Sequence, residues 1–401
     1  MSQPIIFHID VNSAFLSWSA LEHLSAGNEV DIREIPAIIG GDSSTRHGIV
    51  LAKSIPAKRY QIHTGEPVAN AFRKCPNLLM LPPNMSKYKE YSRALMEYLS
   101  GICPDIEQAS VDECYMDYSP IAANYPSPEA AAYFIKDSIF EKFGFTVNIG
   151  ISDKKVLAKM ASDFEKPNRV HTLYSHEIRE KLWPLPVSDL FFCGQSSAGT
   201  LHKLGIRTIG ELATTDPAIL KAHLKSHGLV LWNFANGRDD SVVETVHAKA
   251  KGIGNSTTLP KDVTTLPEAK KVLLSLSESV GKRMRAAHSC AESICTEIKY
   301  SDFRSVSHQM NITPPISSTD AIYRHSCELF EELWDGSPIR LLGVRVTKLM
   351  EEDTPVQLSL FDYQAPVSEK QQKLDAALDA IRSRYGKDAI KRGSLMDSPK
   401  S

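Results

Sequence analysis

The sequence has no apolar run long enough to cross a membrane. A membrane-spanning helix needs about 18 or more consecutive apolar residues, and no such run occurs in the 401 residues. The start of the chain, Met1-Ser2-Gln3-Pro4, also lacks the basic residues and the apolar stretch of a secretory signal. These absences argue against a membrane protein and predict a cytoplasmic one.

Cysteine motifs, an excess of charge and repeats are absent as well. The seven cysteines are odd in number and include no Cys-x-x-Cys, which argues against a disulfide framework and a structural zinc site. A formal net charge of −2 gives no overall signal of nucleic-acid binding, so any such contact has to come from local patches. No internal repeat or low-complexity tract occurs.

The chain does have enough apolar residues for several cores. Hydrophobic residues make up 42% of the sequence, and about 100–200 residues form a typical domain, so two to four domains are expected. Short helices with glycine breaks are predicted between 170 and 238, and a polar tether at 239–251. Strands are predicted at 4–10, 35–39, 49–52, 106–110, 114–117 and 146–151, and helices at 13–23, 85–101, 128–143, 154–164 and 368–385.

Three carboxylates stand at the ends of predicted strands. Asp10 ends the first apolar run, and Asp112 and Glu113 lie where a strand meets a turn. Adjacent residues of a strand project to opposite faces unless a turn re-aims one of them, so a hairpin tip would let both carboxylates reach a common metal. Convergent carboxylates suit Mg²⁺ or Mn²⁺ and predict two-metal phosphoryl or nucleotidyl transfer. Taken alone, an Asp-Glu pair is more often a solvated turn.

The Asp112-Glu113 pair does not stand alone, because several other motifs occur in a fixed order along the chain. They are Asp10-Val11-Asn12-Ser13-Ala14-Phe15, Gly40-Gly41-Asp42, Ser110-Val111-Asp112-Glu113, Lys166-Pro167-Asn168, Asn236-Gly237-Arg238-Asp239 and Pro338-Ile339-Arg340-Leu341-Leu342-Gly343. In order and spacing the chain resembles the Y-family translesion DNA polymerases, and within them the bacterial DNA polymerase IV branch. The resemblance runs from the first strand to about residue 350.

The resemblance implies a multidomain α+β fold, the right-hand polymerase with a mixed α/β palm, small fingers, a helical thumb and an α/β little finger. The implied domains are a palm at 1–12 and 76–166, fingers at 13–75, a thumb at 167–238, a tether at 239–251, a little finger at 252–350 and a C-terminal tail at 351–401. It also implies error-prone, template-directed DNA synthesis without proofreading. The expected partners are primer–template DNA, a dNTP and a sliding clamp, with the chain itself a monomer.

The resemblance also assigns the metal site. In the family, the carboxylates that match Asp10, Asp112 and Glu113, together with the backbone carbonyl that matches Val11, hold two Mg²⁺ ions between a primer 3′-hydroxyl and the incoming dNTP. Such ions lower the pKa of the attacking hydroxyl and stabilise charge on the departing pyrophosphate. Mn²⁺ is a possible substitute.

Three further residues match family positions that contact the nucleotide. Phe15 falls at the steric gate, a ring beneath the sugar that excludes a 2′-hydroxyl, although a phenylalanine on a first helical turn is otherwise a core residue. Lys58 and Lys166 match positions that grip the triphosphate, where cations neutralise charge on the leaving group. Outside this context each would be a surface lysine.

The chain departs from the family pattern at four positions. Asn12 replaces an Asp found in some relatives, Ile55 a common Tyr, and Lys58 a common Arg, whose planar fork a lysine cannot reproduce. Phe192 stands where relatives carry the first glycine of a helix-hairpin-helix turn that binds a DNA phosphate. Because phenylalanine is costly at positive φ, the sequence predicts an altered hairpin and a weaker phosphate contact.

The tail carries a short motif that resembles the peptide with which bacterial polymerases dock on the sliding clamp. Gln357, Leu358, Leu360 and Phe361 supply its hydrogen-bonding and apolar side chains. The same residues could instead pack on the protein's own surface.

Two other function classes stay open at this point. A catalytically silent relative could serve as a clamp- and DNA-binding scaffold, with the departures at Ile55, Lys58 and Phe192 in its favour and the three carboxylates against it. A metal-dependent phosphohydrolase or nucleotidyl cyclase with a similar palm would leave the later segments and the clamp-like peptide unexplained.

Overall fold

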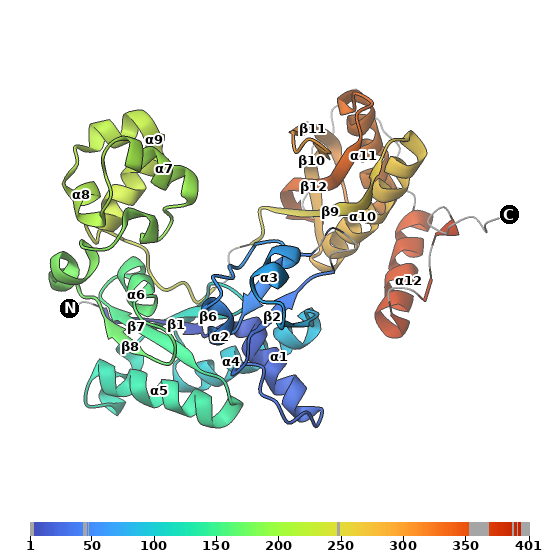
Figure 1. Ribbon diagram of the computed structural model, residues 1–401. Coiled ribbons are helices and arrows are strands. Elements are labelled where there is room, and N and C mark those ends of the chain that lie inside the picture. The colour runs from blue at the N-terminus through green and yellow to red at the C-terminus, as the bar shows by residue number, and fades with distance from the viewer. Residues whose placement is uncertain are drawn as a thin grey trace. The chain divides into compact units, whose positions relative to one another are not determined.

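The computed structural model describes residues 4–42, 46, 48–246, 249–352, 369–386, 389–390 and 392–393 (Figure 1). The chain forms two compact units. The first consists of Met1–Gly41 and Gly48–His247, and the second of Asp42–His47 and Ala248–Ser401. Within the described ranges no helix is both long and apolar enough to cross a membrane.

The first unit is built around a five-stranded sheet with the strand order β5-β6-β1-β7-β8. The central strand β1 is antiparallel to both β6 and β7, whereas β8 runs parallel to β7. Three helices and a 3₁₀ turn accompany the sheet (Figure 1). The bounds are β1 Ile6–Val11, β5 Ile106–Gln108, β6 Glu113–Asp117, β7 Val147–Ser152, β8 Val170–Thr172, α4 Met85–Ile102, η2 Ser119–Asn124, α5 Pro128–Phe143 and α6 Lys155–Ser162.

The two faces of this sheet have different roles. Every residue of β1 is buried, and because side chains alternate along a strand, Phe7, Ile9 and Val11 lie on one face, in the core that includes α4 and α5. The even-numbered residues lie on the other face, where Ile6 packs with Ala158 of α6. Asp10 therefore projects on the face covered by α6.

A second, three-stranded sheet with the order β3-β2-β4 follows α1 in the chain. Its strands and helices enclose two small apolar clusters of their own. The strands predicted at 35–39 and 49–52 are present as β2 and β3, but strand β4 and helix α3 had not been assigned from the sequence. The bounds are α1 Ala14–Ser25, β2 Ala37–Gly40, β3 Val50–Lys53, α2 Ile55–Lys58, α3 Val68–Lys74 and β4 Leu79–Leu81.

The predicted helical segment after β8 contains short helices around a separate apolar core. They are the 3₁₀ turn η3 Ser175–Glu177, the π-helical turn η4 Ile178–Leu182, the 3₁₀ turn η5 Val187–Asp189, and α7 Gln195–Lys203, α8 Ile209–Thr214 and α9 Pro217–Ala235, which kinks at Lys225. Phe192, expected to disturb its turn, adopts a φ of 70°, so the left-handed backbone is kept with phenylalanine in place. Its exposed ring contacts Phe191 and Phe234, which offsets part of the steric cost.

The second unit is a four-stranded antiparallel sheet with the order β11-β10-β12-β9 and two long helices, α10 and α11, that share one core with it. The helix predicted in the tail is also present as α12. The bounds are β9 Gly252–Val263, α10 Leu266–Ala286, β10 Ser289–Tyr300, β11 Ser305–Ile316, α11 Thr319–Leu333, β12 Ile339–Glu351 and α12 Glu369–Tyr385.

Candidate active site

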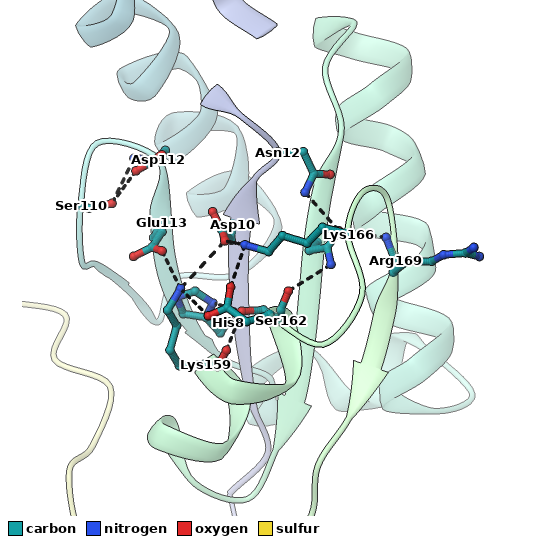
Figure 2. Close-up of polar contacts among 12 residues, drawn as sticks. His8, Asp10, Asn12, Ser110, Asp112, Glu113, Lys159, Ser162, Lys166 and Arg169 are labelled. Carbon is teal, nitrogen blue, oxygen red and sulfur yellow. Dashed lines mark hydrogen bonds and ion pairs between the residues drawn. The ribbon is translucent and has the colours of Figure 1, made fainter. Parts of the chain in front are cut away.

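A cleft of about 390 Å³ in the first unit brings together most of the residues predicted from the sequence. They come from β1, from the start of α1, from α2, from the turn before β6 and from the loop after α6. Those that line it are Asp10, Val11, Phe15, Lys58, Asp112 and Lys166. Glu113 is the one predicted residue of this unit that does not line the cleft, and it lies directly beside Asp10 (Figure 2).

The three carboxylates meet at one end of the sheet because of a bend before β6. Asp10 and Glu113 are paired across antiparallel strands, so their side chains share a face. Asp112 precedes the strand, and its carbonyl accepts a 3.0 Å hydrogen bond from the Val11 N–H. Because Asp112 stands in this bend and not in the strand, the alternation along β6 does not fix the direction of its side chain.

The carboxylates are adjacent, but they do not form a closed ligand set. Asp112 accepts a 2.7 Å hydrogen bond from Ser110 Oγ, and Glu113 turns toward α6 (Figure 2). Among the residues that the structure describes, no group of three or more His, Cys, Asp or Glu side chains is close enough to hold a metal. What the site offers is hard oxygen donors at one end of the sheet, the chemistry that Mg²⁺ and Mn²⁺ prefer.

Two lysines balance the negative charge of this end of the sheet. Lys159 of α6 donates a 2.6 Å hydrogen bond to Glu113 and lies 3.9 Å from Asp10. Lys166 contacts Asp10 (Figure 2). Both lysines also pair with Asp163, Lys159 at 3.3 Å and Lys166 at 2.7 Å. Lys159 was missed from the sequence, although its spacing of four residues from Asp163 on a predicted helix places the two on one helical face.

Burial and these ion pairs act in opposite directions on the ionisable groups. Burial raises the pKa of Asp10 from 3.8 to about 6, against the opposing effect of Lys166 and Lys159. Burial alone would lower the pKa of each lysine, but the neighbouring carboxylates, Asp10 foremost, outweigh it and raise both. The lysines therefore remain cationic beside a carboxyl group that takes up a proton more readily than an exposed one.

Asn12 has a structural role where some relatives carry Asp. Its amide nitrogen donates a 3.1 Å hydrogen bond to Asn148 on β7, and its oxygen accepts one of 2.9 Å from the backbone N–H of Asn168. Asn148 in turn donates to the carbonyls of Ser162 and Glu165. Asn12 thus fixes the loop that carries Lys166, a function that a carboxylate could not perform while also donating to Asn148.

The predicted gate residue is supported by a second ring. Phe15 stacks on Tyr88 of α4, with ring centroids 4.4 Å apart, and the Tyr88 hydroxyl is hydrogen-bonded at 2.7 Å to Ser19. Both Tyr88 and Ser19 are buried, so the ring beneath Phe15 is held in place. Tyr88 was not selected from the sequence, because a tyrosine at this position of a helix carries no signal that distinguishes it from the core.

Lys58 and Ile55 lie on the short helix α2, whose first turn is capped by the side chain of Ser54. Lys58 is exposed and lines both the main cleft and a smaller adjoining one of about 110 Å³, which Ile55 also lines. Lys166 lines the same two clefts, so the two predicted triphosphate contacts face a common space.

His8 is a buried residue on the same face of β1 as Asp10. Its Nδ1 is hydrogen-bonded at 2.8 Å to Ser162 Oγ, and its Nε2 has no partner among the described residues. Burial, with Lys159 and Lys166 nearby, lowers the pKa of His8 well below its usual value. A neutral His8 therefore helps to hold α6 on the sheet through its hydrogen bond to Ser162.

Comparisons with known proteins decide the family. The chain matches the impB/mucB/samB family at residues 9–163 and the C-terminal domain of the same family at residues 250–360. It is 46% identical to a DNA polymerase IV of Clostridium acetobutylicum over 393 residues, which cover 98% of both chains. It is 35% identical to a DNA polymerase IV of Acetivibrio thermocellus, over 98% of this chain and 97% of that one. The chain belongs to the DNA polymerase IV branch of the Y-family DNA polymerases.

The chain also has the fold of a solved Y-family DNA polymerase. The Y-family DNA polymerase chimera Dbh-Dpo4(243-245)-Dbh aligns with a TM-score of 0.75 over 86% of this chain and 99% of that one, at 23% identity. The multidomain α+β fold and the family predicted from the sequence are thus confirmed, and the chain is a DNA-directed DNA polymerase of the translesion type. The full-length match also accounts for the segments that a phosphohydrolase or cyclase would leave unexplained.

Proposed function

We propose that this chain extends primers on damaged templates by two-metal nucleotidyl transfer, with error-prone synthesis and no proofreading. One observation carries the proposal: carboxylates, a stacked aromatic ring and two lysines, each matching a family position, line or adjoin one cleft. The domain assignment proposed for this chain is the one given by the resemblance.

Asp10, Asp112, Glu113 and the Val11 carbonyl are the residues that would hold two Mg²⁺ ions, with Mn²⁺ as a substitute. Their oxygen donors and their meeting at one end of the sheet fit such ions. Bound ions of this kind lower the pKa of a primer hydroxyl and neutralise a triphosphate. Lys166, which contacts Asp10, is close enough to the carboxylates to bind triphosphate oxygens beside them.

The remaining cleft residues would select and orient the nucleotide. Lys58 and Lys166 supply two cations from different elements, which would hold the triphosphate from two sides. Phe15, braced by Tyr88, would present a rigid ring edge to the sugar, so a 2′-hydroxyl would be rejected by overlap. A primer–template DNA and a dNTP are the substrates that these contacts require.

We further propose that the chain works as a monomer and docks on a sliding clamp through Gln357, Leu358, Leu360 and Phe361. These four residues lie outside the described residues, so their sequence is the support for this part of the proposal. The weaker phosphate contact at Phe192 stays a prediction, because the left-handed turn is kept and only the side chain differs.

Primer extension on undamaged and lesion-bearing templates, with Mg²⁺ and Mn²⁺ compared, tests the proposal. Asp112→Ala or Glu113→Ala should abolish incorporation while primer–template affinity stays nearly unchanged, because these residues would hold metals and not DNA phosphates. Extension by either variant at the wild-type rate would reject the assignment. A wild-type chain that binds DNA but extends nothing would establish the silent scaffold instead.

A further inference from the structure

Helix α12 is mostly polar, yet it is attached to the body of the second unit. The sequence predicts it as a helix at 368–385 in the C-terminal tail, after the clamp-like motif. In the structure it is held by the Arg285 side chain of α10 and by a backbone N–H at the start of α11, the two helices that complete the core of this unit. An isolated helix of 17 residues is marginal in water, so contacts with the second unit are expected to stabilise it.

Asp375 is the centre of this attachment. Its side chain is 2% exposed and accepts a 3.1 Å hydrogen bond from the backbone N–H of Thr319, the first residue of α11. Arg285 and Arg392 each lie 3.4 Å from its oxygens. A carboxylate at a helix N-terminus satisfies a backbone donor that the helix cannot, and it interacts favourably with the helix dipole. Burying a carboxylate is costly unless it is paired and hydrogen-bonded, so these three partners indicate a specific contact between α12 and the rest of the second unit.

A set of ion pairs surrounds Asp375. Arg285 of α10 bonds to Asp379 at 2.8 Å, and Arg382 of α12 bonds to Glu278 of α10 at 3.1 Å. Both pairs have side chains less than a fifth exposed, so water and salt screen them less than surface pairs. Arg392, beyond the helix, reaches Glu278 at 3.1 Å and Asp320 at 2.5 Å.

The chain leaves the second unit after β12 beside the start of α11, and α12 is attached at the same place, which we call the corner. Past the end of β12, Glu352 donates its backbone N–H to the His288 carbonyl at 3.1 Å, and its carboxylate accepts a 3.4 Å bond from Ser317 Oγ. Ser317 is two residues before Thr319, which Asp375 contacts. Arg285 joins both, because its guanidinium also donates to the Ser317 carbonyl at 3.4 Å.

We propose that α12 is an ion-pair clasp that attaches the C-terminal tail to the corner where it departs, so that the chain between Glu352 and Glu369 is fixed at both ends. This inference rests on the proposed function in one respect: the clamp-like residues 357–361 belong to that stretch of sequence. In general, fixing both ends of a peptide segment reduces the conformations open to it before it binds a partner. Because binding costs less ordering when a segment is already restricted, the clasp should strengthen docking on the clamp.

Hydrogen exchange on the full-length protein tests the clasp itself. Amides of α12 should exchange at least about tenfold more slowly than those of an unstructured chain, and Asp375→Ala or Arg382→Met should remove that protection. Arg384→Met, at an exposed position two residues further along the same helix, is the matched control and should change nothing. Amides of β10 and β12 should stay protected in every variant, which separates release of the helix from unfolding. Unprotected α12 amides in the wild type, or protection insensitive to both variants, would overturn the clasp.

Clamp binding tests the consequence. Full-length Asp375→Ala should bind the bacterial sliding clamp at least about threefold more weakly than the wild type, with clamp-independent primer extension unchanged. If α12 is released and clamp affinity stays the same, the proposed effect on docking is wrong. If the wild type itself does not bind the clamp, the proposed clamp motif fails, while the exchange experiment still decides the clasp.

Discussion

Single residues at the cleft do more than their types alone reveal. Asn12 looks like a missing carboxylate in the sequence, but it connects β1 to β7 and to the loop of Lys166. Lys159 looks like one more lysine on a helix, but it holds Glu113. Their roles depend on which strands lie side by side, and that pairing is not visible in local sequence patterns.

The Phe15 ring should control the choice between dNTP and rNTP. Phe15→Ala should lower the dNTP/rNTP ratio of kcat/KM by at least about tenfold, a loss of roughly 1.4 kcal/mol of discrimination, because a smaller side chain leaves room for the 2′-hydroxyl. Single-nucleotide incorporation kinetics measure both values. Phe140→Ala, at a half-exposed ring on α5, should leave the ratio unchanged. A ratio unaffected by Phe15→Ala would place the gate elsewhere.

The raised pKa of Asp10 predicts how its ionisation affects stability. Its pKa rises from 3.8 to about 6, so between these values the folded state binds more protons than the unfolded chain, and stability from this group falls as pH rises through the window. Asn imitates the protonated acid. In metal-free buffer, Asp10→Asn should therefore gain stability relative to the wild type, by roughly 2 kcal/mol, between pH 4 and pH 7. Thermal melts of both proteins across that range measure the difference, and parallel curves would contradict it.

At the scale of elements, helix α6 and the bend before β6 position the site. The sequence predicted both, because apolar residues recur along the helix up to Lys166-Pro167, and short strand-like runs stand on either side of the bend. Strand β4 and helix α3 were not assigned. β4 has only three residues and α3 seven, too few for periodicity to distinguish a strand or a helix from an apolar stretch of loop.

The close packing of α6 on the five-stranded sheet depends on Gly150. A Cβ added to Gly150 of β7 would come within 2.0 Å of the Ala158 carbonyl and 2.4 Å of the Ser162 nitrogen, both in the backbone of α6. Gly150→Ala should therefore displace the helix that carries Lys159 and reduce both the melting temperature and primer extension. Gly101→Ala, on α4 at a position where the added Cβ clashes with none of the described residues, is the control and should lower neither, because alanine favours a helix more than glycine does. Full activity with Gly150→Ala would show that α6 does not need this close approach.

At the scale of the whole molecule, the sequence was most informative where several motifs agreed. Their order along the chain predicted the family and the α+β fold, although no single motif is decisive. It did not predict the attachment of α12, because Asp375, Arg285 and Arg392 are ordinary surface residues by type and become partners only when the helices pack. Long-range ion pairs leave no periodic signal in a single sequence.

The clamp-like motif gives a prediction that concerns the whole enzyme at work. Leu360→Ala with Phe361→Ala should leave distributive synthesis on short primers unchanged, because the cleft is complete without the tail. What should be lost is stimulation by the clamp, since tethering raises the local concentration of polymerase at the primer end and so lengthens products without changing single-nucleotide chemistry.

The size of that loss follows from burial. Each apolar side chain contributes on the order of 1.5–3 kcal/mol when it is fully buried, so removing both should weaken docking by at least about tenfold. The competing possibility is that the pair packs on the protein's own surface, and then the double variant should melt at a lower temperature and still respond to the clamp. Product length with and without the clamp, together with the melting temperature, therefore separates a partner motif from a structural one in a single variant.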